Sequence, residues 1–183
     1  MLNSRPLPFD AIAEARRQWE AHGWPSSPAM TAVTSIMRAQ QIVLARVDAV
    51  LKPLDLTFAR YEALVLLYFS RTGALPMGKM GDRLMLHPTS VTNIIDRLED
   101  QGFVRRVSHP TDRRTTLAEI TDAGRQAVEA ATEATSAISL GMGNLTDEEL
   151  DQITELLRRL RLDAGDFPDD PDDTHDTHDG PGG

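Results

Sequence analysis

The sequence predicts a mainly α-helical, α+β protein in which two short helices and a β-hairpin lie between longer helices. Apolar residues recur at helical spacing over most of the 183 residues. Two segments rich in strand-forming residues, 103–107 and 115–120, flank a polar stretch, 108–114, and this order predicts a hairpin. The composition, 40% hydrophobic and 26% charged, is that of a packed globular protein and excludes a globally disordered or collagen-like chain.

Several function classes are excluded by residue types that the sequence lacks. It contains no cysteine, which excludes disulfides, thiolate zinc sites and cysteine nucleophiles. The five histidines are scattered, and no G-x-S-x-G, H-E-x-x-H or P-loop pattern occurs. We therefore expect no catalytic residues, no metal site and no cofactor. The longest apolar run, 63–69, is far shorter than the roughly 20 residues that cross a bilayer, so we expect a cytoplasmic protein without a membrane partner.

The first two helices are predicted from their start signals. Asp10 is a suitable N-cap for a helix that ends at Gly23. Ser27 followed by Pro28 forms an N-cap and first-turn pair, and apolar residues then recur at helical spacing to about Lys52. The second helix is therefore long and amphipathic.

The middle of the chain predicts a core helix followed by two short helices. Thr57 can cap the next helix, which is expected to stop near Gly73. Its segment 63–69 is apolar almost all round, and this predicts that the helix lies at the centre of the core. Helices over 76–85 and 88–101 follow, separated by a brief turn. Two helices joined by a tight turn predict a helix-turn-helix motif.

The last part of the chain returns to helix. Thr121 begins an Ala-rich helix that is expected to end at Asn144, and Thr146 with Glu149 forms the capping box of a final helix. The final helix carries one stripe of apolar residues. So small a segment does not need to bury this stripe for its own stability. We infer a partner surface from this stripe: Leu150, Ile153, Leu156, Leu157 and Leu160.

The net charge of −9 is concentrated at the C-terminal end. Residues 163–183 contain eight Asp and no Lys or Arg, and this composition predicts a disordered acidic tail. Without these eight charges, residues 1–162 carry a net charge of −1. Residues 76–115 contain seven basic and five acidic side chains, with five arginines between positions 97 and 114. The charge balance is therefore compatible with a polyanionic partner.

The helix over 88–101 has the composition of a surface that reads nucleic acid. Its apolar residues, Val91, Ile94, Ile95 and Leu98, fall on one side. The other side carries small hydroxyls, an amide and a guanidinium, which are groups that hydrogen-bond base edges and phosphates. We expect DNA contacts from Thr89, Ser90, Thr92, Asn93 and Arg97. An ordinary solvated helix face is the alternative interpretation.

The loop 108–114 supplies a second candidate contact. Arginines at the tip of a hairpin can enter a narrow minor groove, for which Arg113 is our first choice and Arg114 the second. His109 is expected to contact phosphate. Asp96 and Asp112 would repel DNA if unpaired, so we predict that a wing arginine neutralises each of them, which would also fix the loop against the helix over 88–101.

These motifs together resemble the MarR family of winged helix-turn-helix transcription regulators. The resemblance rests on four patterns: DRLE at 96–99, G-F-V-x-R at 102–106, DRR at 112–114 and I-T-x-x-G at 120–124. It covers roughly residues 30–162. It implies an obligate homodimer that binds a pseudo-palindromic operator on double-stranded DNA, with the 88–101 helix in the major groove and the 108–114 wing in the minor groove.

The resemblance also implies a domain organisation. Residues 1–27 form an extra N-terminal helix and linker, 28–56 a dimerisation helix, and 57–120 the winged helix-turn-helix lobe. Residues 121–162 form C-terminal dimerisation helices before the tail at 163–183. The Ala-rich composition of the helix from Thr121 permits close helix approach in such a dimer.

Part of the sequence resembles the urate-responsive subgroup of this family, through the extra helix with Trp19 and through Arg106. Glu62 stands where that subgroup has Asp, and Ile94 where it has arginine. The resemblance implies a repressor released by an anionic or aromatic ligand that binds Trp19, Arg38, Glu62 and Arg106, with ligand and Glu62 competing for the Arg106 guanidinium. The alternative is structural, with Trp19 as a packing anchor and Glu62 paired to Arg106. A second function class, a winged-helix module that binds only proteins, also remains open.

Overall fold

The computed structural model describes residues 7–112 and 114–168. The described part of the chain forms two compact units divided after Gly141. The helices and strands follow in this order: α1 (Ala11–Ala21), α2 (Ser27–Leu51), η1 (Lys52–Leu54), α3 (Phe58–Phe69), β1 (Ala74–Pro76), α4 (Met77–Leu84), α5 (Pro88–Asp100), β2 (Val104–Ser108), β3 (Thr116–Ile120), α6 (Asp122–Ser136), η2 (Ser139–Gly141) and α7 (Asp147–Asp163).

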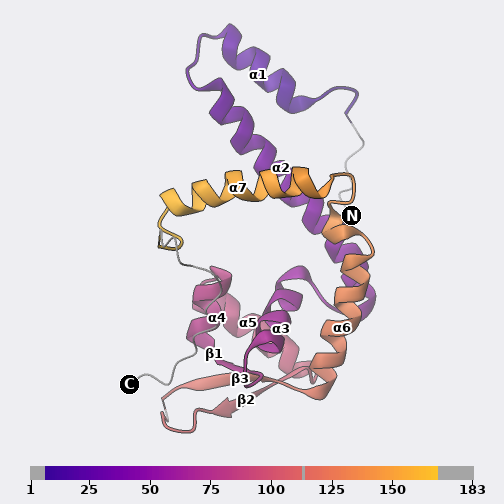
Figure 1. Ribbon diagram of the computed structural model, residues 1–183, viewed down its shortest axis with the longest axis vertical. Coiled ribbons are helices and arrows are strands. Elements are labelled where there is room, and N and C mark those ends of the chain that lie inside the picture. Colours follow the sequence, from indigo (N-terminus) through magenta and orange to yellow (C-terminus); the bar gives the residue numbers. More distant parts are fainter. Residues whose placement is uncertain (1–6, 113, 169–183) are drawn as a thin grey trace. The chain divides into compact units, whose positions relative to one another are not determined.

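Helices α1 and α2 pack side by side (Figure 1). The predicted N-cap of α1 is confirmed, because the Asp10 carboxylate accepts hydrogen bonds from the backbone of Ile12 and Ala13. The predicted cap of α2 is wrong. Ser27 is the first helical residue, and its hydroxyl donates to Glu20 at 2.8 Å instead of capping the helix. The N-cap position belongs to Ser26, which makes no side-chain cap bond.

The sheet has three antiparallel strands in the order β1-β3-β2, one more strand than the sequence predicts. Leu75 of β1 and Arg106 of β2 both lie opposite Ala118 of β3. β1 is an edge strand, so Pro76 can end it without removing a hydrogen bond from the middle of a sheet. A strand of three residues that runs into a helix leaves no alternating pattern to recognise.

The core lies between α3, α5 and the sheet. Leu64 and Leu67 of α3 are fully buried, which confirms α3 as the central helix. Ile95 and Leu98 of α5 pack into the same core, together with Ala118 of β3. The two short helices α4 and α5 lie on one side of the sheet with α3 (Figure 1). The exposed side of α5 and the loop between β2 and β3 are thus held by one packed lobe.

The Ala-rich helix is shorter than predicted. α6 begins directly after Thr121, close to the expected start, and the Thr121 side chain caps it by accepting from the backbone of Gly124. The helix ends at Ser136 instead of Asn144. The chain then bends through Leu140 at φ 50° and Gly141 at φ 82°. The bend lets the Gly141 carbonyl accept a hydrogen bond from Arg46 of α2 at 2.7 Å. This tertiary contact replaces the last helical turns.

The second unit contains α7. Its predicted capping box is present, with Thr146 and Glu149 each accepting from the other's backbone. After α7, Asp166 accepts a hydrogen bond from Arg161 at 2.7 Å. The predicted acidic tail from 163 therefore begins with residues that belong to α7 or contact it, and its remainder, 169–183, lies outside the described residues. In the described chain no helix is long and apolar enough to span a membrane.

Candidate nucleic-acid interface

The N-terminus of α5 is exposed. His87 is the N-cap, and its ring accepts from the Thr89 backbone at 3.3 Å, while Pro88 occupies the first turn. The turn before it passes through Met85 at φ 51° and is closed by a hydrogen bond from Leu86 to the Gly81 carbonyl at 2.9 Å. The sequence interpretation placed His87 in the turn and missed its role as a cap. A polar residue directly before Pro88 is the signal that could have revealed it.

The structure places the residues that were predicted to contact DNA together on α5. Thr89, Thr92, Asn93 and Arg97 are all exposed, and Ser90 is half-buried at the margin of this face. Val91, Ile95 and Leu98 on the opposite side are buried, as the periodicity predicts. We call the exposed set Thr89, Thr92, Asn93 and Arg97 the α5 polar face.

Asp96 is also exposed beside the α5 polar face, but its charge is paired. Arg106 of β2 donates to Asp96 at 2.5 Å and to Glu99 of α5, and the Arg106 backbone N–H donates to Glu99 at 3.0 Å. Burial tends to lower the pKa of Arg106, but the hydrogen bonds that it donates to Asp96 and Glu99 outweigh this effect and raise that pKa. Asp96 is therefore paired with an arginine, as predicted, but this arginine comes from strand β2 and not from the wing loop 108–114. It also fixes α5 against the base of the wing.

The wing loop is held by side-chain bonds to its own backbone. The Asp112 carboxylate accepts from the Arg114 backbone at 2.9 Å and from the Thr115 hydroxyl at 2.6 Å. These two hydrogen bonds lower the pKa of Asp112. Among the described residues no guanidinium pairs with Asp112, so the expected arginine partner is replaced by the loop backbone and a hydroxyl. Short loops leave backbone N–H groups free, and an Asp acceptor suits them.

The remaining wing residues have different positions. The His109 ring accepts from the Asp112 backbone at 3.1 Å, so one of its nitrogens is used inside the loop. Arg114 is exposed. Arg113, our first choice for a minor-groove contact, lies outside the described residues.

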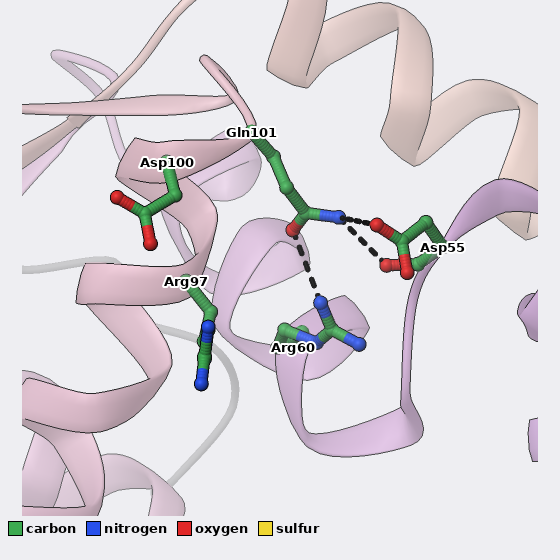
Figure 2. Close-up of a pocket in the computed structure, with 5 residues that line it drawn as sticks. All are labelled: Asp55, Arg60, Arg97, Asp100 and Gln101. Atoms are coloured by element: carbon green, nitrogen blue, oxygen red, sulfur yellow. Dashed lines mark hydrogen bonds between the residues drawn. The ribbon is translucent and has the colours of Figure 1, made fainter.

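A pocket of about 460 Å³ lies between α3 and the C-terminal end of α5, and sequence reasoning missed it (Figure 2). Gln101 joins its two sides, because it donates to the Asp55 carbonyl at 2.7 Å and accepts from Arg60 at 3.2 Å. Arg97 and Asp100 complete the lining. The pocket therefore shares Arg97 with the α5 polar face.

The four predicted ligand residues do not form one contact cluster among the described residues. Trp19 donates to the Pro25 carbonyl at 2.8 Å and packs edge-on against Trp24, so it acts as a packing anchor. Arg106 pairs with Asp96 and Glu99 on α5, so the expected pair with Glu62 is wrong. In the β2–β3 register Arg106 lies opposite Ala118, and its two ion pairs show that its side chain is directed to α5.

Arg38 and Glu62, the other two predicted ligand residues, are exposed. Burial of part of the Glu62 carboxyl raises its pKa. No group of three or more His, Cys, Asp or Glu side chains within 7–112 and 114–168 could hold a metal ion.

Comparison with known proteins decides the family. Residues 56–116 match the MarR family. A solved structure from Streptomyces coelicolor, Sco5413, described as a MarR family transcriptional regulator, is 58% identical with a TM-score of 0.73 and matches over 78% of this chain and 99% of its own. The chain belongs to the MarR family.

Two further proteins are similar to this chain over shorter spans. The HTH-type transcriptional regulator MhqR of Bacillus subtilis is 35% identical over 109 residues, 57% of this chain and 71% of that protein. The structure of CouR from Rhodococcus jostii RHA1, bound to p-coumaroyl-CoA, is 25% identical with a TM-score of 0.61 and matches over 73% of this chain and 90% of its own. The winged-helix fold and a role in transcription regulation through DNA binding follow from family membership.

Proposed function

We propose that this MarR family member is a homodimeric repressor that binds a pseudo-palindromic operator, with α5 in the major groove and the wing loop 108–114 in the minor groove. The α5 polar face is the observation that carries the proposal. It offers two hydroxyls, an amide and a guanidinium, exposed on a helix whose other side is locked into the core. These groups suit base edges, since Asn and Arg form bidentate pairs with adenine and guanine.

Neutralisation of Asp96 supports this placement. An unpaired carboxylate beside the α5 polar face would repel phosphate, and Arg106 removes that repulsion. The same guanidinium also bonds Glu99 one turn further along α5. The wing base and the reading helix therefore approach DNA as one rigid element. Arg113 and Arg114 at the wing are the proposed minor-groove contacts.

Exposed apolar side chains support a homodimer. On α2, Val33, Ile36 and Met37 are exposed, and on α7 Leu156 and Leu160 are 63% and 58% exposed. Apolar residues at helical spacing on two helices are typical of interfaces rather than of free surface. A two-fold dimer would place its reading helices about 34 Å apart, in successive major grooves of a pseudo-palindrome.

Release by a small ligand is the regulatory part of the proposal. The similarity to CouR, whose structure holds p-coumaroyl-CoA, supports an effector for this chain. Of the four residues expected to bind it, Trp19 and Arg106 are engaged within the chain, so the exposed Arg38 and Glu62 are our candidate contacts for an anionic or aromatic effector. A ligand lowers DNA affinity only if it binds the DNA-incompetent state more tightly. Melting titrations of the wild type and of Arg38→Ala with aromatic carboxylates test this set, and equal shifts in both proteins would remove it.

The deciding experiment selects DNA from a random pool with the purified full chain and measures affinity at several salt concentrations. We expect a pseudo-palindromic site whose affinity falls steeply with salt, because a dimer that binds phosphates releases counterions. Arg97→Ala should cost about 1–3 kcal/mol and relax the preference at one base pair. Arg71→Ala, an exposed arginine outside the α5 polar face and the wing, is the matched control.

Two results would contradict the proposal. Uniform loss across all sequences in Arg97→Ala would make Arg97 a phosphate contact. Weak association that is insensitive to salt, with no selected sequence, would favour the protein-binding module.

A further inference from the structure

The pocket between α3 and α5 joins the DNA-reading helix to the segment that leads from α2 into α3. Asp55 lies in that segment at φ 53°, Arg60 is in the first turn of α3, and Arg97, Asp100 and Gln101 come from the end of α5 (Figure 2). About 460 Å³ is room for a small metabolite. Of its lining, only Arg97 belongs to the α5 polar face.

Part of the lining is already satisfied and holds the pocket in shape. Gln101 uses its amide N–H₂ on the Asp55 carbonyl at 2.7 Å and on the Asp55 carboxylate at 3.0 Å. Its amide oxygen accepts from Arg60 at 3.2 Å, and Arg60 also donates to Thr57 at 3.4 Å. These bonds preorganise Arg60 and Asp55, which reduces the ordering cost of binding.

The other part of the lining carries unused charge. Among the described residues, the side chains of Arg97 and Asp100 form no hydrogen bond or ion pair with a neighbour, although they lie three residues apart on α5. The pocket thus contains two guanidinium groups and two carboxylates. A plain anion meets Asp55 and Asp100, and a plain cation meets Arg60 and Arg97, so each is partly repelled. A molecule with both charges is complementary.

We propose that this pocket binds a small zwitterion of the amino-acid type. Its carboxylate is held by Arg97 and Arg60, because a guanidinium matches the planar carboxylate with paired N–H donors. Its ammonium is held by Asp100, which lies on the Arg97 side of the pocket, whereas the Asp55 carboxylate on the other side is bonded by Gln101 (Figure 2). Occupancy engages Arg97 and so withdraws it from DNA, a consequence that rests on the proposed DNA contact of Arg97. By thermodynamic reciprocity, bound DNA then weakens binding of the zwitterion by the same factor.

Calorimetric titration of the full chain with each of the twenty common amino acids tests the proposal without DNA. We expect at least one to bind once per chain. Its analogues that lack either the ammonium or the carboxylate should bind at least about tenfold more weakly, since each leaves charge of the pocket unpaired. Asp100→Asn, an exposed and nearly isosteric change, should weaken binding of the zwitterion to the same extent. Arg60→Gln should have the same effect.

A second arm measures DNA affinity with and without the amino acid that binds. We expect weaker DNA binding in the wild type when the amino acid is present, and no such change in Asp100→Asn. Without the amino acid, the DNA affinity of Asp100→Asn should be at least that of the wild type, because a carboxylate beside Arg97 is removed. The proposed zwitterion site is contradicted if none of the twenty amino acids binds, or if Asp100→Asn binds the amino acid as tightly as the wild type does. Binding without an effect on DNA overturns the coupling through Arg97. If the wild type binds no DNA even without amino acids, the proposed function is contradicted. The calorimetry would still show whether the pocket binds a zwitterion.

Discussion

Arg106 Nη2 on β2 lies 2.5 Å from Asp96 Oδ1 on α5, in a pair that joins the base of the wing to the reading helix. The same side chain bonds Glu99, so one guanidinium spans two carboxylates. The Arg106 side chain is only 27% exposed, which reduces solvent screening. A planar fork with several fixed donors can hold both partners, whereas an ammonium acts as a point charge.

Replacement of Arg106 by Lys should therefore weaken DNA binding more than it weakens the fold. We expect a loss of about 1 kcal/mol in unfolding free energy, as for a partly exposed charged network, and a clear loss of DNA affinity because the wing base can shift against α5. Fluorescence anisotropy and thermal melting measure the two effects. Arg105→Lys is the matched control, since Arg105 is the neighbouring residue of β2 and pairs with Glu119 in a more exposed position. Equal losses of DNA affinity in both variants would contradict the assigned role of Arg106.

Replacement of Asp112 by Ala should impair the wing loop selectively. The variant loses the acceptor for the Arg114 backbone and the Thr115 hydroxyl, so the loop samples more conformations. We expect the preference for sites with A·T-rich flanks to fall, because the wing arginines no longer enter the minor groove in one orientation. Thermal stability should change by less than about 0.5 kcal/mol, as at most surface positions.

Asp112→Asn keeps an oxygen acceptor at the same position and should retain most of the flank preference. Binding to a selected site with A·T or G·C flanks measures the difference. The idea fails if Asp112→Ala keeps the wild-type preference.

Local signals explain how much of the fold was predictable. The caps at Asp10, Thr57 and Thr146 were predicted correctly, because each depends on a few residues around one helix start, whereas the cap predicted at Ser27 was wrong. The end of α6 was not predicted correctly. The chain leaves the helix after Ser136 and turns at Leu140, so that Gly141 contacts α2. Such contacts join residues far apart in the sequence, where periodicity carries no information.

The same contrast applies to the candidate site. Helical periodicity was sufficient to gather the α5 polar face, because all its members lie on one helix. The partner of Arg106 required the register of β2 against β3, and the sequence alone suggested Glu62 instead. The pocket was missed because Gln101 meets Asp55 across 46 positions of the chain. Charged residues near helix ends gave no signal that distinguished it from ordinary surface.

Replacement of Gly124 by Ala should destabilise the junction between the wing and α6. A Cβ at Gly124 would lie 2.2 Å from the Phe103 carbonyl oxygen, a backbone atom that cannot rotate away. The Thr121 backbone and hydroxyl also donate to that carbonyl, so its position is fixed. We expect a loss of about 1–3 kcal/mol in unfolding free energy by denaturant titration, as for other overpacked sites.

Gly78→Ala is the matched control for this change. Gly78 lies in α4, and a Cβ there meets nothing within 4 Å. Alanine should stabilise that helix by about 0.5–1 kcal/mol, because glycine loses more backbone entropy. Opposite signs for the two substitutions support the steric explanation, and similar signs would contradict it.

Replacement of Glu62 by Gln should raise stability at neutral pH and have little effect in acid. Burial of part of the carboxyl raises the pKa of Glu62 above its value in the unfolded chain. Ionisation is therefore easier in the unfolded state, so the contribution of Glu62 to stability is greatest below its unfolded pKa, about 4.3, and falls as pH rises through the folded pKa. Gln removes this penalty, and the melting temperature should increase at pH 7 but not near pH 4. Glu62→Asp keeps the charge and should not reproduce the increase. An equal gain at both pH values would show that packing, rather than desolvation of the charge, limits stability at this position.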